Sequence, residues 1–136
     1  MYELLFHDFA QSDDTLRVYR GERLVFASNK DRLLPLLEYI DRLGRNPQPV
    51  VLFDKIMGNA AALLAVIAKC QEIYSPLGSQ LAARTLERHG IEYHFTLTVP
   101  YIQKPDLTMC PMEQLSLNKE PAEFYALLKK RAGASS

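Results

Sequence analysis

The sequence predicts a three-layer α/β/α domain with a mixed β-sheet that begins with an N-terminal hairpin. An alternating apolar and polar pattern over residues 15–27 is interrupted by a turn at Gly21, which is typical of a hairpin. The run "VVLF" within residues 49–53 is continuously apolar, as expected of a strand covered on both faces. Helical and strand-like segments then alternate, which favours a partly parallel sheet.

The elements follow from local patterns. The hairpin strands are expected at 15–20 and 23–27. A helix is expected within 29–47, because apolar residues recur on one face and Gly44 and Pro47 end the pattern. The strand at 49–53 should be central in the sheet. The helix at 58–70 is apolar on nearly every side, so it should be among the most buried segments.

The second half of the chain continues the alternation. A short strand is expected at 72–76, a helix at 77–90 with Ser75 or Ser79 as its cap, and a strand at 91–102. Residues 108–115 predict a short helix. A C-terminal helix at about 120–132 is opened by Pro121 and closed by Gly133.

Composition narrows the class of protein. The 136 residues predict a single domain, 1–136, and the sixteen basic and sixteen acidic side chains balance. Because nucleic-acid and membrane-surface binders normally carry a basic excess, we expect neither partner. Two cysteines, no signal-peptide pattern and no apolar run near the roughly 20 residues of a membrane span favour the cytoplasm.

Asp54 and Lys55 follow the apolar strand directly, and Gly58 and Asn59 open the buried helix. The free N–H groups of a helix start can bind an anion such as phosphate, which makes these four residues candidate ligand-binding residues. The local alternative is that Asp54 caps the helix, Lys55 is solvated, and Gly58 serves close packing.

The stretch "TMCPMEQL" at 108–115 supplies two more candidates. Pro111 suits the first helical position, and Glu113 suits an exposed first turn, where its carboxylate meets the positive helix end and can reach back to a cap N–H. Cys110 is a poor cap, so it is either a nucleophilic thiol activated by the helix start or a packed apolar side chain. We therefore assign the function to Cys110 and a structural role to Glu113, which is also a candidate ligand contact.

The remaining chemistry-bearing residues receive no role. The three histidines, His7, His89 and His94, show no metal-ligand spacing in the sequence. Cys70, at the end of the predicted buried helix, is interpreted as core packing.

The motifs "DKIMGNAAALL", "IYSPLGSQLAARTLERHGI" and "VPYIQ…MCPMEQL" resemble, in this order, the DUF1893 family of small microbial proteins. The resemblance covers about residues 12–118, which it marks as the domain core, and it implies a cytidine-deaminase-like fold and a bacterial source. Zinc-dependent deaminases of that fold take one ligand from H-x-E or C-x-E and two from P-C-x-x-C. Here "DKIMGNA" has no His, Cys or Glu, and Glu113 replaces the second cysteine.

Without the zinc set, the expectation is a deaminase-like domain that has lost zinc chemistry and holds no metal or other cofactor. The leading hypothesis is a nucleotide or nucleoside-like ligand bound by Asp54, Lys55, Gly58, Asn59 and Cys110. The alternatives are a thiol enzyme in which Glu113 or Asp54 orients Cys110, and a non-catalytic interaction protein. The sequence leaves open whether a reaction is catalysed and whether the chain forms a homo-oligomer.

Overall fold

The computed structural model describes the backbone of residues 2–135 and the side chains of residues 2–131. Along this part of the chain the elements are α1 (Glu3–Gln11), β1 (Leu16–Arg20), β2 (Arg23–Ser28), α2 (Leu34–Leu43), β3 (Val50–Asp54), β4 (Ile56–Met57), α3 (Asn59–Ile67), β5 (Cys70–Ser79), α4 (Gln80–Arg88), β6 (Glu92–Val99), α5 (Pro111–Leu115) and α6 (Pro121–Ser135).

The strands form one mixed sheet in which β2-β1-β3-β5 are neighbours in this order, and both β4 and β6 also pair with β5. The pairs β1–β2 and β1–β3 are antiparallel, whereas β5 runs parallel to β3, β4 and β6. The predicted hairpin and the central position of the 49–53 strand are therefore confirmed, and the mixed sheet is as expected.

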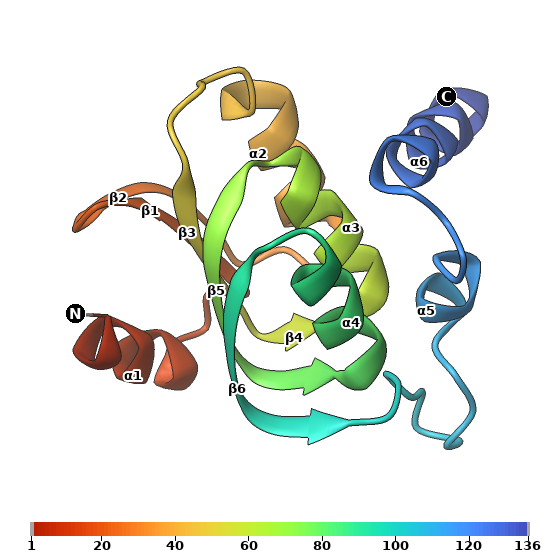
Figure 1. Ribbon diagram of the computed structural model, residues 1–136, viewed down its shortest axis with the longest axis horizontal. Helices are drawn as coiled ribbons and strands as arrows, with labels where there is room; N and C mark the ends of the chain where they lie inside the picture. Colours follow the sequence, from red (N-terminus) through yellow and green to blue (C-terminus); the bar gives the residue numbers. More distant parts are fainter. Residues whose placement is uncertain (1, 136) are drawn as a thin grey trace.

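Helices cover both faces of the sheet, which gives the three layers that the sequence predicts. Figure 1 shows α1 on one side of the sheet and α2, α3 and α4 on the other. Outside α3 lie α5 and α6, and Phe124 of α6 is completely buried in the same apolar cluster as α3. Within residues 2–135, no helix is both long and apolar enough to cross a membrane.

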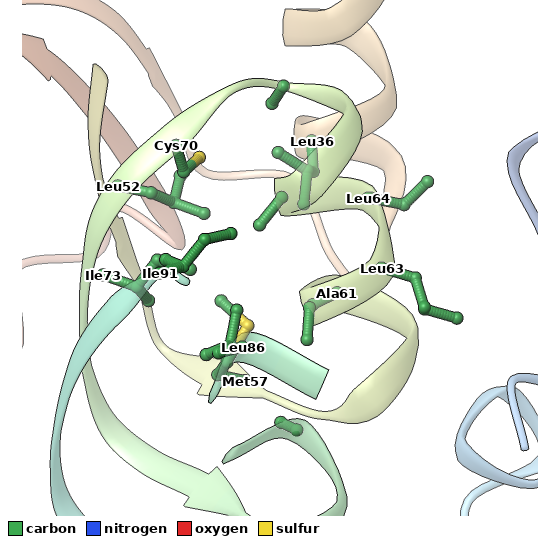
Figure 2. Close-up of a cluster of buried hydrophobic side chains, with 14 of the residues drawn as sticks. Leu36, Leu52, Met57, Ala61, Leu63, Leu64, Cys70, Ile73, Leu86 and Ile91 are labelled. Carbon is green, nitrogen blue, oxygen red and sulfur yellow. The ribbon is translucent and has the colours of Figure 1, made fainter. Parts of the chain in front are cut away.

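The main core lies around α3. All residues of this helix from Asn59 to Ala65 are buried, so the prediction of a deeply buried helix is confirmed. Figure 2 shows Leu63 and Leu64 pointing away from Leu52 and Ile73 of the sheet, so the two sides of α3 face different neighbours. Because the sheet covers one side of α3 and α5 and α6 cover another, the helix is apolar nearly all round.

Several boundaries differ from the sequence prediction: α4 begins at Gln80 instead of 77, and β6 ends at Val99 instead of 102. The helix expected at 58–70 ends at Ile67, and Lys69 takes a positive φ of 61° in the turn that follows. Cys70, expected at the helix end, is instead the buried first residue of β5. The strand expected at 72–76 is ten residues long, because Pro76 falls between the residues of β5 that pair with β3 and those that pair with β4.

Two elements were missed, and one helix is longer than predicted. Helix α1 was not expected, although Phe6 and Phe9 lie on one face of it and Phe9 is fully buried against the sheet. Strand β4 is only two residues long, too short to give a pattern. Helix α6 continues past Gly133 to Ser135.

Candidate functional site

Three of the predicted ligand-binding residues, Gly58, Asn59 and Glu113, meet at the start of α3, where α5 packs against it. We call this region the α3 entrance and include in it Cys110, the residue before α5. Gly58 and Asn59 come from the start of α3, Glu113 comes from the first turn of α5, and Asp54 is the last residue of β3.

Glu113 is the centre of the α3 entrance, and its environment differs from the prediction. Its side chain is only 2% exposed, so it does not belong to an exposed first turn. One carboxylate oxygen accepts a hydrogen bond from the N–H of Asn59 at 2.5 Å, and the other accepts from the N–H of Ile102 at 2.8 Å. Glu113 therefore supplies to the start of α3 the negative charge that a bound anion would otherwise supply.

Asn59 extends this contact into a buried polar network. Its amide nitrogen donates to the carbonyl and to the hydroxyl of Ser116, at 3.1 and 3.0 Å, and its amide oxygen accepts from the hydroxyl of Thr85. The Ser116 hydroxyl donates to the carbonyl of Glu113 at 2.6 Å. The network joins α3 to α4 and α5, and the side-chain groups of Asn59 are used inside the protein.

Gly58 has extended backbone angles, φ −86° and ψ 177°, that any residue can adopt. A Cβ atom at this position would lie 3.0 Å from the carboxylate oxygen of Glu113 and 3.0 Å from Cγ1 of Ile102. A side chain at this position would therefore push Glu113 or Ile102 away by a few tenths of an ångström, so glycine favours the close approach of Glu113 to α3, which is the packing role that the sequence allowed for it.

Asp54 and Lys55 point to opposite sides of the sheet. Asp54 is partly buried, and loss of water around its carboxyl raises the pKa to about 7, against smaller opposing effects of hydrogen bonds from the backbone of Ile56 and Lys55. The ammonium of Lys55 donates to the carbonyl of Ser12 at 2.6 Å and lies 4.9 Å from the ring centroid of Phe9. The structure therefore does not bring Lys55 to the α3 entrance.

Cys110 is the residue before α5, as the sequence predicts, and Pro111 is the first residue of that helix. Its thiol is free and half-buried. Its backbone N–H donates to the carbonyl of Ile102 at 2.8 Å. A separate expectation, that Ser79 caps α4, is confirmed by its hydroxyl, which accepts from the N–H of Ala82 at 3.0 Å.

Zinc, which the deaminase resemblance implies, does not fit the α3 entrance. Both oxygens of Glu113 accept backbone hydrogen bonds, and residues 54–60 contain no His, Cys or Glu. Among the described residues, a set of three side chains with ligand atoms close enough for one metal ion occurs only at Glu72, Glu92 and His94, on β5 and β6.

A second region lies on the other face of the sheet. An open hollow of about 470 Å³ separates α1 from β5 and β6, and we call it the α1 hollow. One face of α1 forms a wall of the hollow, and β5 and β6 form its floor. The residues that line it are Glu3, Phe6, His7, Ala10, Tyr74, His94, Phe95 and Thr96. Residues at these spacings on α1 share one helix face.

The floor of the α1 hollow is aromatic at one end. The ring of His94 stacks on that of Tyr74, with centroids 4.4 Å apart and an interplanar angle of 22°, and Phe6 lies 5.5 Å from Tyr74. The Tyr74 hydroxyl donates to Glu72 at 2.9 Å. Burial raises the pKa of Tyr74, and the hydrogen bond to Glu72 and the nearby carboxylates of Glu72, Glu3 and Glu92 raise it further.

The α1 hollow was missed because no local pattern contains it. The i, i+2 spacing of Glu72 and Tyr74 and that of Glu92 and His94 place each pair on one strand face. Only the parallel register, which sets Glu72 beside Glu92 and Tyr74 beside His94, brings the four side chains together. The spacing within each pair was the only available signal.

The fold and these two regions define a small mixed α/β domain with a closed helix start on one face and an open hollow on the other. The family model for a domain of unknown function, DUF1893, matches residues 6–131, so the chain belongs to the DUF1893 family. The match extends beyond the 12–118 core on which the sequence resemblance rests.

A solved structure agrees with this assignment. The chain is similar to a DUF1893 family protein (TM1506) from Thermotoga maritima, with 25% sequence identity and a TM-score of 0.83 over 94% of this chain and 87% of that chain. None of the curated proteins compared with the chain matches it. The cytidine-deaminase-like topology stays a prediction, because the family and the solved structure are described only as DUF1893.

Proposed function

We propose that this protein binds a small planar molecule of nucleoside type, and that the ligand lies in the α1 hollow instead of the α3 entrance. The observation that carries the proposal is the hollow itself. Its volume of about 470 Å³ falls in the range of small-molecule sites, roughly 300–1,000 Å³. Its aromatic surfaces come from Phe6, Tyr74 and His94.

The α3 entrance is the weaker location for a ligand. The first N–H of α3 donates to Glu113, and the side chain of Asn59 is held by Ser116 and Thr85. An anion at the start of α3 would have to displace the buried carboxylate of Glu113 from its hydrogen bond with the N–H of Asn59, and leaving a buried acceptor unsatisfied costs about 1–3 kcal/mol.

The chemistry of the α1 hollow favours a base and sugar without a phosphate. A flat ring can stack on an aromatic side chain, and such stacking contributes about 1–3 kcal/mol per base. Around the hydroxyl of Tyr74 stand the carboxylates of Glu3, Glu72 and Glu92. The exposed carboxylate of Glu92 can accept hydrogen bonds from sugar hydroxyls, and the negative charge of the glutamates repels a phosphate.

The thiol-enzyme alternative lacks an orienting residue in Glu113, because both of its oxygens are engaged with backbone N–H groups. Asp54 is the remaining candidate for that role. Reactivity of Cys110 towards electrophiles therefore stays an alternative that the site geometry favours less than binding in the α1 hollow.

The test is a thermal-shift screen of the four common nucleosides and their 5′-monophosphates, carried out in EDTA so that no divalent ion contributes. We expect at least one nucleoside to raise the Tm and its monophosphate to have a smaller effect. Ala10→Trp, which places a large ring in the α1 hollow, should abolish the shift. Ala122→Trp is the matched control, because Ala122 is exposed on α6.

Two results would contradict the proposal. In the first, no nucleoside changes the Tm. In the second, Ala10→Trp keeps the full response, which would place the ligand elsewhere.

A further inference from the structure

Glu72, Glu92 and His94 form a compact group of side chains on β5 and β6, and His94 also lines the α1 hollow. Glu72 and Glu92 are register partners on the parallel strands β5 and β6, and Tyr74 and His94 are the next pair on the same face. Nε2 of His94 lies 2.8 Å from a carboxylate oxygen of Glu72 and 4.0 Å from one of Glu92. All three ligand atoms lie within 4.8 Å of one another.

From this geometry we infer a divalent-cation site in which Glu72, Glu92 and His94 supply one ligand atom each. Two donors about 2.1 Å from one tetrahedral zinc ion are about 3.4 Å apart. The observed separations of 2.8 and 4.0 Å lie on either side of that value. Small rotations of the Glu92 side chain, which is 68% exposed, are enough to close the difference.

The charges around the group point to a cation. Like charges directly opposite one another on neighbouring strands are destabilising, and Glu72 and Glu92 are in this arrangement. A bound divalent ion would offset this repulsion more fully than the single charge of a protonated His94.

The surrounding contacts hold the ligands in place. His94 stacks on Tyr74, which restricts the imidazole, and the hydroxyl of Tyr74 donates to the same Glu72 oxygen that faces His94. Such outer contacts orient metal ligands and tune metal affinity. One imidazole and two carboxylates suit zinc or manganese, and three protein ligands leave at least one coordination position open.

When the divalent ion binds, it replaces a proton. In the metal-free protein a proton can occupy the short contact between Nε2 of His94 and the Glu72 oxygen. The ion takes the position of that proton and binds the nitrogen lone pair, and the proton passes to solvent. No bond in the protein is broken and no redox change is required.

The test uses the full chain without an affinity tag, stripped with EDTA, and zinc alone as the probe. The imidazole NMR signals of the three histidines are assigned by substitution. We expect zinc to shift the signal of His94 and to leave those of His7 and His89 in place. Competition with a chromophoric chelator should give one site per chain.

Variants separate a built site from surface adsorption. His94→Ala and Glu92→Gln should each weaken zinc binding by about tenfold or more. His89→Ala and Glu22→Gln, which change the same residue types outside the group, should leave the affinity within about twofold. If His94→Ala fails to fold, the exposed position of Glu92 keeps the second variant informative.

The proposal is overturned if the His94 signal does not respond to zinc, or if His94→Ala and Glu92→Gln bind zinc as the wild type does. Either result would mean that Glu72 and His94 form only an ion pair. Because the zinc titration contains no nucleoside and the nucleoside screen contains EDTA, failure of one proposal leaves the other standing.

Discussion

The α3 entrance and the α1 hollow lie on opposite faces of one sheet. They differ in how far their polar side chains are buried and whether these have partners inside the protein. At the α3 entrance, the carboxylate of Glu113 and the amide of Asn59 have partners inside the protein and are buried. At the α1 hollow, Glu92 and His94 are exposed, and two glutamates are register partners. Buried polar groups with complete hydrogen bonding stabilise a fold, whereas exposed groups of like charge can bind a ligand.

The difference teaches that residue type alone does not separate a binding site from a structural network. The sequence offers a carboxylate, a glycine and a free helix start at the α3 entrance, which together resemble an anion site. In the folded protein Glu113 fills that position itself. The following changes test whether the α3 entrance is structural, from the largest expected effect to the smallest.

Glu113→Gln should destabilise the protein by about 2–3 kcal/mol, because one amide N–H₂ would then face a backbone N–H where an oxygen now accepts. Urea unfolding measures this cost. Glu123→Gln is the control, since Glu123 is exposed in the first turn of α6 and accepts from the N–H of Glu120 at 3.2 Å. A loss below about 1 kcal/mol is expected there.

If Glu113→Gln instead keeps its stability and abolishes nucleoside binding, then Glu113 is a ligand contact. The assignment of the ligand to the α1 hollow would fall with that result.

Asp54→Asn should change how stability depends on pH. The carboxyl pKa is about 7 in the folded protein against 3.8 for the ordinary side chain, so the folded state binds the proton more tightly. This group therefore contributes its full stability below about pH 4 and loses it as the pH rises towards 7. The variant carries no such titration and should gain stability relative to wild type over that interval.

Unfolding of both proteins by urea at intervals between pH 4 and pH 8 checks this prediction. Parallel stability profiles for the two proteins would show that Asp54 has an ordinary pKa in the fold, and that the region around it is wetter than the geometry indicates.

Cys110→Ser should have the smallest effect, with a change in stability below about 0.5 kcal/mol. Serine is a better residue than cysteine at the position before a helix, because its hydroxyl can accept from a first-turn N–H. Nucleoside and zinc binding in the α1 hollow should be unchanged. Loss of nucleoside binding in this variant would return the ligand to the α3 entrance and favour the thiol alternative.

Much of the fold could be predicted because the hydrophobic pattern of each segment determines its secondary structure and burial. The hairpin, the central strand β3 and the buried helix α3 each show a periodicity that reports how many of their sides are covered. Helix α1 was missed although Phe6 and Phe9 have helical spacing, since the N-terminal segment was interpreted only as lacking the pattern of an export signal. The short β4 is defined by pairing with β5 and not by its own residues.

The two regions depended on contacts between distant segments. Glu113 meets Asn59 across 54 residues of sequence, and His94 meets Glu72 across 22. Lys55 lies on the α1 side, where its ammonium donates to the carbonyl of Ser12 across 43 residues of sequence. By itself the sequence determined the layers, the core and the residue types at the strand ends, because hydrophobic periodicity is a property of each segment. The tertiary structure alone decided which carboxylate is satisfied inside the protein and which faces the solvent, because that depends on strand register and on the packing of α5 against α3.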